Sequence, residues 1–451
     1  MFLKQIYTDC LAQASYYIES DEESIIIDPI RDDQIYAGIL NERKSKLKYI
    51  FETHFHADFV SGHIELSNSM NAEIIFGPNA DTSFQSTIAR DYQFFKFGKL
   101  KIQVIHTPGH TMESSCFLLY DEDDKPKAIF TGDTLFIGEV GRPDLAVNPN
   151  LNSRDLAGHL FDSLRNKIMT LPDHIVVYPA HGAGSACGKN ISHERYSTIG
   201  EQRMNNYALQ EMTKIEFIDK VLNGISSPPK YFAHDVNMNK NGYIPMSNVL
   251  SNSLNPLTFD EIFELSQQED VVILDVRSPI EFEKGFIDNS INIGKSGMFA
   301  PWVGTIISPN DKIILICNKD EEIEVVSRLG RIGYENVIGF STEISSWIRS
   351  NKNMNSLHSI YANDINQYKN NSVFLDVRKE SELFVGSVAN SINIPLDTLF
   401  DNLNKLNRSD EIIIYCAGGY RSVIAASILM SEGFKNVKNI YGGFKSIAAV
   451  N

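Results

Sequence analysis

Two histidines and an aspartate stand at intervals of two residues directly after an apolar run. The run is residues 49–51, and the segment that follows carries His54, His56 and Asp58. Imidazole and carboxylate groups are common ligands of divalent metals, and at the end of a strand they can converge on one ion. The pattern therefore predicts a metal centre that begins in this segment.

Three further side chains of the same kinds follow apolar runs. His110 lies in Thr-Pro-Gly-His-Thr, Asp133 in Thr-Gly-Asp and His181 in Pro-Ala-His-Gly. Each alone also suits a capping or core polar residue. Together, at the expected ends of successive strands, they indicate a single site built from several strands.

A cysteine in a glycine-rich loop predicts a second kind of chemistry. Cys416 begins the sequence Cys-Ala-Gly-Gly-Tyr-Arg-Ser, between an apolar strand-like run and a helix-like run. Backbone N–H groups of such a loop, with the helix N-terminus, favour the thiolate. Arg421 adds positive charge that can hold an oxyanion such as sulfite or thiosulfate, and Gly418 and Gly419 of the loop are expected to bind the substrate.

The elements that position these residues include an internal repeat. Residues 272–277 recur as 373–378, and residues 313–317 recur as 412–416. Each copy alternates apolar strands with helical segments, which favours two duplicated parallel α/β domains. We expect a first domain over 1–230, a Ser-, Pro- and Asn-rich linker over 231–257, and repeats over 258–350 and 351–451.

The two repeats differ at the cysteine. The first copy reads Cys-Asn-Lys-Asp-Glu-Glu from Cys317, without glycine or arginine. Its three carboxylates oppose a thiolate and repel anionic sulfur donors. We therefore expect the first copy to be catalytically silent, although an active Cys317 remains the alternative.

The motifs together resemble a known family. The series from His54 to His181 looks like the metallo-β-lactamase fold, and Gly-Arg-Pro-Asp at 141–144 resembles its persulfide dioxygenase branch. The loop of Cys416 resembles that of single-domain rhodaneses. The whole chain resembles bacterial persulfide dioxygenase–rhodanese fusions. This implies a multidomain α/β protein, with an αββα sandwich followed by two rhodanese-like domains.

The resemblance implies one Fe(II) per chain, held by His54, His110 and Asp133. Two histidines and one carboxylate leave open positions for substrate and oxygen, although zinc would take the same ligands. A two-metal hydrolase would need a histidine at position 59, where this chain has Phe59. His56, Asp58 and His181 are then expected to orient ligands or substrate by hydrogen bonds. Alternatively, water or another side chain replaces the histidine and two zinc ions bind.

Two more residues carry open alternatives. Arg142 either anchors an anionic part of the substrate or pairs with Asp144. Cys187, in a glycine-rich segment near the expected mouth of the metal site, either handles persulfide sulfur or is a spare thiol on a flexible loop.

The implied activity oxidises a low-molecular-weight thiol persulfide, of glutathione or coenzyme A type, with O2 to sulfite and free thiol. Cys416 would then form or consume thiosulfate, and the role would be sulfide detoxification. One rival is a glyoxalase II-like thioester hydrolase with two zinc ions. Another is a non-catalytic sulfur-carrier or docking module.

Composition narrows the setting. The 451 residues are 43% hydrophobic and 22% charged, and the net charge of −16 argues against a nucleic-acid partner. Five scattered cysteines suit a reducing compartment. We find no signal peptide and no long apolar run, so a cytoplasmic protein without a membrane span is expected, with a homo-oligomer as a possible assembly.

Overall fold

A computed structural model describes the chain except for residues 226, 350–353, 370 and 451. The chain forms two compact units, Met1–Met246 with Leu329–Gly333, and Ser247–Arg328 with Tyr334–Asn451. The boundary expected between residues 350 and 351 lies outside the described residues. Among the helices described, none is long and apolar enough to cross a membrane.

The first unit contains two six-stranded sheets. In the first sheet, β1 to β3 are antiparallel and β3 to β6 are parallel. The turn between β2 and β3 has positive φ at Asp21 and Glu22, as two-residue hairpins of right-twisted strands require. Its strands are β1 Phe2–Thr8, β2 Gln13–Ser20, β3 Glu23–Ile27, β4 Lys46–Glu52, β5 Glu73–Phe76 and β6 Thr87–Ile88.

The second sheet has the order β12-β11-β10-β9-β8-β7. Only the pair β10 and β11 is parallel. Its strands are β7 Phe94–Phe97, β8 Leu100–His106, β9 Ser115–Tyr120, β10 Pro126–Gly132, β11 Val176–Pro179 and β12 Ser197–Thr198.

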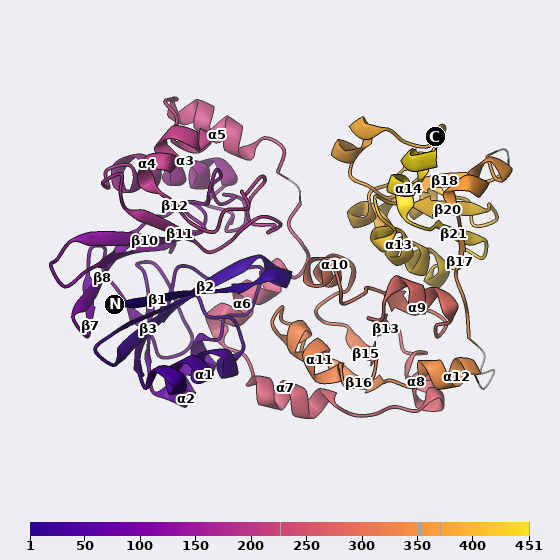
Figure 1. The fold of residues 1–451 in the computed structure, drawn as a ribbon, viewed down its shortest axis with the longest axis horizontal. Helices are drawn as coiled ribbons and strands as arrows, with labels where there is room; N and C mark the ends of the chain where they lie inside the picture. The colour runs from indigo at the N-terminus through magenta and orange to yellow at the C-terminus, as the bar shows by residue number, and fades with distance from the viewer. Residues whose placement is uncertain (226, 350–353, 370, 451) are drawn as a thin grey trace. The chain divides into compact units, whose positions relative to one another are not determined.

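Helices cover the outer face of each sheet (Figure 1). Buried residues such as Ile27, Phe51 and Phe117 fill the space between the sheets. A second core, which includes Leu160, Leu164 and Phe217, lies under the helices of the second sheet. The four layers confirm the predicted αββα sandwich. The helices are α1 Asp33–Arg43, α2 His63–Met70, α3 Ser153–Ser163, α4 Ile199–Asn205 and α5 Lys214–Leu222.

The second unit contains two parallel sheets, one for each repeat. The first has the order β14-β13-β15-β16 and the second β17-β21-β20-β18-β19. The first copy comprises α8 Phe259–Leu265, β13 Val271–Asp275, α9 Pro279–Lys284, β14 Ile291–Asn292, α10 Phe299–Ile306, β15 Lys312–Ile316, α11 Glu322–Gly330, β16 Val337–Ser341 and α12 Ile344–Arg349. The second comprises β17 His358–Ile360, β18 Val373–Asp376, β19 Ile392–Asn393, β20 Ile412–Tyr415, α13 Tyr420–Ser431, β21 Val437–Ile440 and α14 Gly443–Val450, with short 3₁₀ turns.

The segment expected to be a linker, residues 231–257, is mostly helical. It carries α6, Phe232–Asn241, and α7, Met246–Ser253. α6 buries Phe232, Met238 and Asn239. Its polar composition suggested a loop, but hydrogen bonds of Asn239 on the buried face of α6 hold this helix in the first unit, and composition alone does not reveal such contacts.

Candidate functional site

The loop after β4 is held at the carboxyl end of the parallel strands. Asp28, directly after β3, accepts hydrogen bonds from the Thr53 backbone N–H at 2.8 Å and from its hydroxyl at 2.9 Å. β3 and β4 run parallel, so their ends meet at one edge of the sheet. The first metal-binding residues therefore start from a fixed anchor.

His54, His110 and Asp133 converge on one point. Their ligand atoms lie within 4.8 Å of one another, and all three side chains are buried. Asp133 Oδ2 is 3.9 Å from His54 Nε2 and 3.5 Å from His110 Nε2. The three residues follow β4, β8 and β10, so they lie at the ends of three strands from two sheets. The predicted set of three is brought together.

The hydrogen bonds of the two rings direct their Nε2 atoms toward this point. His110 Nδ1 donates to the Arg142 carbonyl at 2.8 Å. The Thr53 hydroxyl already donates to Asp28, so His54 Nδ1 donates to that hydroxyl at 3.0 Å. Burial, together with the charges of neighbouring imidazoles, holds the pKa of His54 well below its usual range. A neutral ring with a free Nε2 lone pair is what a metal requires.

Asp133 gives an independent indication of a cation. Among the residues that the structure describes, neither of its buried carboxylate oxygens has a hydrogen-bond partner. A buried carboxylate without donors is costly unless a cation neutralises it. The donor set fits iron(II) or zinc.

The His56 ring lies 4.3 Å from that of His54, centroid to centroid, but its Nε2 faces two other carboxylates. Its Nε2 is 3.2 Å from Asp28 and 3.4 Å from Glu52. Burial disfavours the charged ring, but the two carboxylates outweigh it and hold the pKa of His56 well above its usual range. The Phe59 ring packs against it, with a centroid distance of 4.3 Å. His56 therefore supports the loop.

Cys416 lies in the loop between β20 and α13 of the second repeat. The Gly419 N–H donates to its Sγ at 3.1 Å, and the Ser422 hydroxyl lies 3.5 Å from it. Gly419 has a φ of 100°, which glycine adopts without strain. A Cβ added at Gly418 would meet no atom within 4 Å, so there is open space beside the loop.

Arg421 differs from its expected place. Its two terminal nitrogens donate to the Glu382 carboxylate at 2.6 and 2.7 Å. This ion pair occupies the groups that were expected to hold an oxyanion. Sequence reasoning missed Glu382 because it lies 39 residues before its partner Arg421.

Comparisons with known proteins assign each domain of the chain to a family. The model of the metallo-beta-lactamase superfamily matches residues 8–181, and that of the rhodanese-like domain matches residues 258–350 and 361–449. A solved metallo-beta-lactamase from Staphylococcus aureus is 32% identical, with a TM-score of 0.66 over 76% of this chain and 98% of that one. This chain belongs to the metallo-beta-lactamase superfamily. It carries two rhodanese-like domains behind its metallo-beta-lactamase domain.

Other relatives match the metallo-beta-lactamase domain. A probable hydroxyacylglutathione hydrolase of Schizosaccharomyces pombe is 30% identical over 166 residues, which are 36% of this chain and 60% of that protein. The present chain therefore spans less than two thirds of that relative. The solved structure of ETHE1 from Myxococcus xanthus is 28% identical, with a TM-score of 0.46, over 53% of this chain and 98% of that one.

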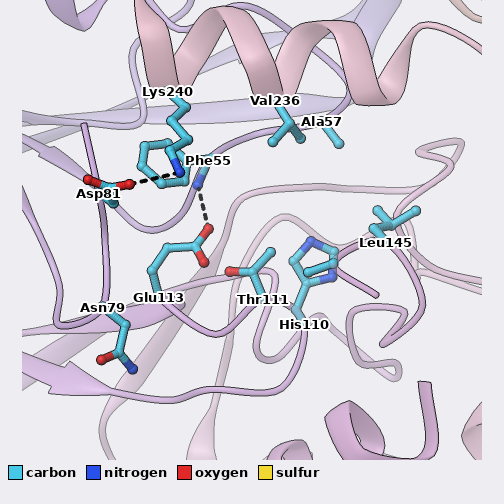
Figure 2. Close-up of a pocket in the computed structure, with 11 residues that line it drawn as sticks. Phe55, Ala57, Asn79, Asp81, His110, Thr111, Glu113, Leu145, Val236 and Lys240 are labelled. Atoms are coloured by element: carbon cyan, nitrogen blue, oxygen red, sulfur yellow. Dashed lines mark hydrogen bonds and ion pairs between the residues drawn. The ribbon is translucent and has the colours of Figure 1, made fainter. Parts of the chain in front are cut away.

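A pocket of about 230 Å³ opens beside His110, one of the three candidate metal ligands of the metallo-beta-lactamase domain. Figure 2 shows α6 passing over it, with Val236 and Lys240 facing Phe55, Leu145 and His110. Lys240 pairs with Asp81 at 3.0 Å, and the Phe55 N–H donates to Glu113 at 3.2 Å. His110 thus joins the metal ligands to a pocket with both apolar and charged walls.

Asn239 of α6 fixes the loop that carries His54 and His56. Its amide nitrogen donates to the carbonyls of His56 and Phe59, each at 2.8 Å. Its amide oxygen accepts from the Ser61 N–H at 2.8 Å. No motif in the sequence pointed to this residue.

We expect Asn239→Asp to weaken metal binding by the metallo-beta-lactamase domain. The carboxylate would face two carbonyls that then lack donors, at a cost of about 1–3 kcal/mol for each buried group. Metal affinity should fall at least about tenfold and the thermal midpoint by several degrees. Calorimetric metal titration and thermal unfolding measure both. Asn237→Asp, on the exposed side of α6, is the matched control, and equal behaviour of the two variants would contradict the expectation.

Arg142 pairs with Asp144 through two hydrogen bonds of 2.7 Å. This ion pair is one of the two alternatives that the sequence left open for Arg142. The guanidinium also donates to the Ala186 carbonyl. Its buried side chain supports the turn whose carbonyl receives His110. Substrate anchoring has no support in this arrangement.

Asp58, His181 and Cys187 lie on the other side of Asp133. His181 Nε2 is 3.4 Å from Asp58 Oδ2 and 3.6 Å from Asp133 Oδ1. Cys187 is buried, with 1% exposure, which does not fit the alternative of a spare thiol on a flexible loop. Burial and the carboxylates of Asp58 and Asp133 raise the pKa of its thiol well above its usual range.

Cys317 of the first rhodanese-like domain lies in an environment that disfavours a thiolate. Burial, followed by the charges of Glu322 and Glu321, raises its pKa to about 12. Lys295 is paired with Glu321 and Glu324, so its charge is shared. These surroundings support the interpretation that the first rhodanese-like domain is catalytically silent.

We expect Cys317 to resist alkylation at pH 8. With a pKa of about 12, only about one thiol in 10⁴ is ionised at that pH. Mass spectrometry of the native protein after iodoacetamide treatment should find Cys317 unmodified. Denatured protein, in which every cysteine reacts, is the control. Rapid modification of native Cys317 would contradict the silent interpretation.

Proposed function

We propose that the protein is an iron(II) persulfide dioxygenase coupled to a sulfurtransferase, and that it removes sulfide as sulfite and thiosulfate. The observation that carries the proposal is the convergence of His54, His110 and Asp133, with Phe59 where a second imidazole would stand. A two-histidine, one-carboxylate face is the common arrangement of non-haem iron oxygenases. The rhodanese-like domains on the same chain add sulfur chemistry.

The proposed reaction converts a persulfide RSSH, O2 and water to RSH, sulfite and two protons. The outer sulfur gives up four electrons, which reduce O2. Iron(II) held by the three ligands would supply the activation of oxygen. The protein's own side chains bind and orient: Phe55, Leu145 and Val236 offer apolar walls for the thiol carrier, and buried His56 fixes the loop that bears His54.

The thiol is proposed to be glutathione or a thiol of similar size. The relative from Schizosaccharomyces pombe is a probable hydroxyacylglutathione hydrolase, so a glutathione conjugate suits a pocket of this fold. One lysine, Lys240, lines the pocket. Coenzyme A persulfide remains the second substrate to test.

The second proposed step belongs to Cys416. A persulfide on its sulfur transfers the outer sulfur to sulfite, which yields thiosulfate and leaves the Cys416 thiolate. The reverse direction consumes thiosulfate by the same bonds. The Gly419 N–H, which points at Sγ, stabilises the thiolate on either side of this exchange.

A thioester hydrolase with two zinc ions is the second candidate, and the hydrolase relative favours it. The two are separated by loading the metal-free protein with iron(II) or zinc, then supplying glutathione persulfide or a hydroxyacyl thioester of glutathione. The proposal expects oxygen uptake with iron and the persulfide. Thioester cleavage with zinc, and no oxygen uptake with iron and either persulfide, would overturn it.

A further inference from the structure

A turn of the first rhodanese-like repeat belongs to the first compact unit. Leu329–Gly333, which leads from the end of α11 toward β16, groups with Met1–Met246, whereas the rest of the repeat groups with the second unit. We call these five residues the inserted turn. The repeat expected to be silent therefore contributes a turn to the unit that holds the candidate metal ligands.

The inserted turn contacts the loop that carries the histidines. The buried Val60 N–H donates to the Arg331 carbonyl at 2.8 Å. Val60 directly follows Phe59, whose ring packs on that of His56, and the His56 ring lies 4.3 Å from the His54 ring, centroid to centroid. A buried N–H that loses its acceptor is costly, so the Arg331 carbonyl fixes this end of the loop.

The segment after β3 holds one side of the inserted turn. Arg31, which is fully buried, donates to the Gly330 carbonyl at 3.1 Å. The Arg331 side chain pairs with Asp32. Asp28, which anchors the start of the histidine loop, lies in the same short segment. The start of that loop and the turn at its end are therefore held by one stretch of chain.

Helix α6 holds the other side of the inserted turn. His234 Nε2 donates to the Gly333 carbonyl at 3.1 Å. Gly333 has a φ of 74°, and a Cβ there would overlap Asp235 Oδ1 and come within 2.8 Å of His234 Cδ2. The same helix carries Asn239, which binds the histidine loop. The turn packs so closely on α6 that a side chain at Gly333 would displace it.

The second repeat has the same turn in an open setting. Gly433, at the position equivalent to Gly333, has a φ of 85°, and a Cβ there would meet no described atom within 4 Å. Residues 430–432 are Met, Ser and Glu, where residues 330–332 are Gly, Arg and Ile. The repeat without the glycine-rich cysteine loop is thus the one whose turn fits α6.

We propose that the silent repeat has a positioning function, in which its inserted turn holds the loop of His54 and His56 in the conformation that binds the metal. The Arg331 carbonyl is the contact with that loop, and Arg31 and His234 hold the turn in place. Metal affinity should therefore depend on the first repeat. The inference rests on the metal centre of the proposed function and not on its reaction with oxygen.

Gly333→Ala tests the proposal, with Gly433→Ala as its matched control. Both substitutions place a Cβ at positive φ, but only the first pushes the turn away from α6. Metal-free full-length protein is titrated with cobalt(II), and binding is followed by calorimetry and by visible absorption. Gly333→Ala should weaken binding at least about tenfold, as substitution of outer partners of metal ligands does, and Gly433→Ala should leave it unchanged. Equal affinity in the two variants, whether lowered or unaltered, would overturn the proposal.

Arg331→Ala provides a second variant should Gly333→Ala fold poorly. It removes an ion pair that holds the turn, whereas the control Arg328→Ala removes a cation of α11 outside the turn. Hydrogen exchange in the metal-free protein is measured by mass spectrometry on the peptide that contains Val60. Exchange should be at least about threefold faster in Arg331→Ala and unchanged in Arg328→Ala. Unchanged exchange in Arg331→Ala would also overturn the proposal.

Oxygen uptake by the iron-loaded protein is measured separately. A difference in metal affinity between Gly333→Ala and Gly433→Ala, without any oxygen uptake, keeps this inference and removes the proposed function. Oxygen uptake together with equal affinities removes the inference and leaves the proposed function standing.

Discussion

His54→Ala should abolish persulfide-dependent oxygen uptake. The substitution removes one of three metal ligands and leaves the buried Asp133 carboxylate with one imidazole fewer. Losing a ligand should cost more than the 10–100-fold seen for outer partners, so we expect metal affinity and uptake to fall by at least about a hundredfold. Iron content after gel filtration and the rate at an oxygen electrode measure the two effects.

His159→Ala is the matched control for that variant. His159 is exposed on α3, outside the ligand cluster. It should bind iron and consume oxygen as the unaltered protein does. If His54→Ala kept its iron and its rate, the assigned ligand set would be wrong.

Cys416→Ser should abolish sulfur transfer and leave oxygen uptake unchanged. The hydroxyl cannot carry sulfane sulfur, so thiocyanate formation from thiosulfate and cyanide should fall by about 10³ or more. Oxygen uptake depends on ligands in the other unit and should continue. The two readouts together assign each reaction to its own domain.

Cys317→Ser is the matched control for the second variant. It changes the equivalent position of the first repeat, where carboxylates replace the glycine-rich loop. Neither activity should change. Loss of sulfur transfer in Cys317→Ser would show that the first repeat takes part in the reaction.

The sequence was sufficient to predict the positions of residues that directly follow a strand. His54, His110 and Asp133 each follow an apolar run, and parallel or adjacent strands bring such ends together. The two repeats were visible for the same reason, because buried strands leave apolar runs. The sandwich and both rhodanese-like domains could therefore be predicted.

The residues that were missed depend on tertiary contacts. Asn239 lies in a segment of loop-like composition, and only its hydrogen bonds to the metal-binding loop reveal its role. Arg421 was expected to hold an oxyanion. The sequence does not show that it pairs with Glu382 at 2.6 Å, because Glu382 lies in another element. Cys187 had two alternatives, a thiol that handles persulfide sulfur and a spare thiol on a flexible loop, and the sequence did not show that it is buried. No local pattern carries information of this kind.

The ratio of oxygen consumed to sulfite formed tests the central claim most directly. Iron-loaded Cys416→Ser protein, in which no sulfite is converted to thiosulfate, is supplied with glutathione persulfide, and sulfite is trapped for chromatography. The dioxygenase account predicts one sulfite for each O2, and neither sulfite nor uptake in the same protein with Asp133→Ala added. Sulfite formation without oxygen, or no uptake by protein with iron bound, would contradict it.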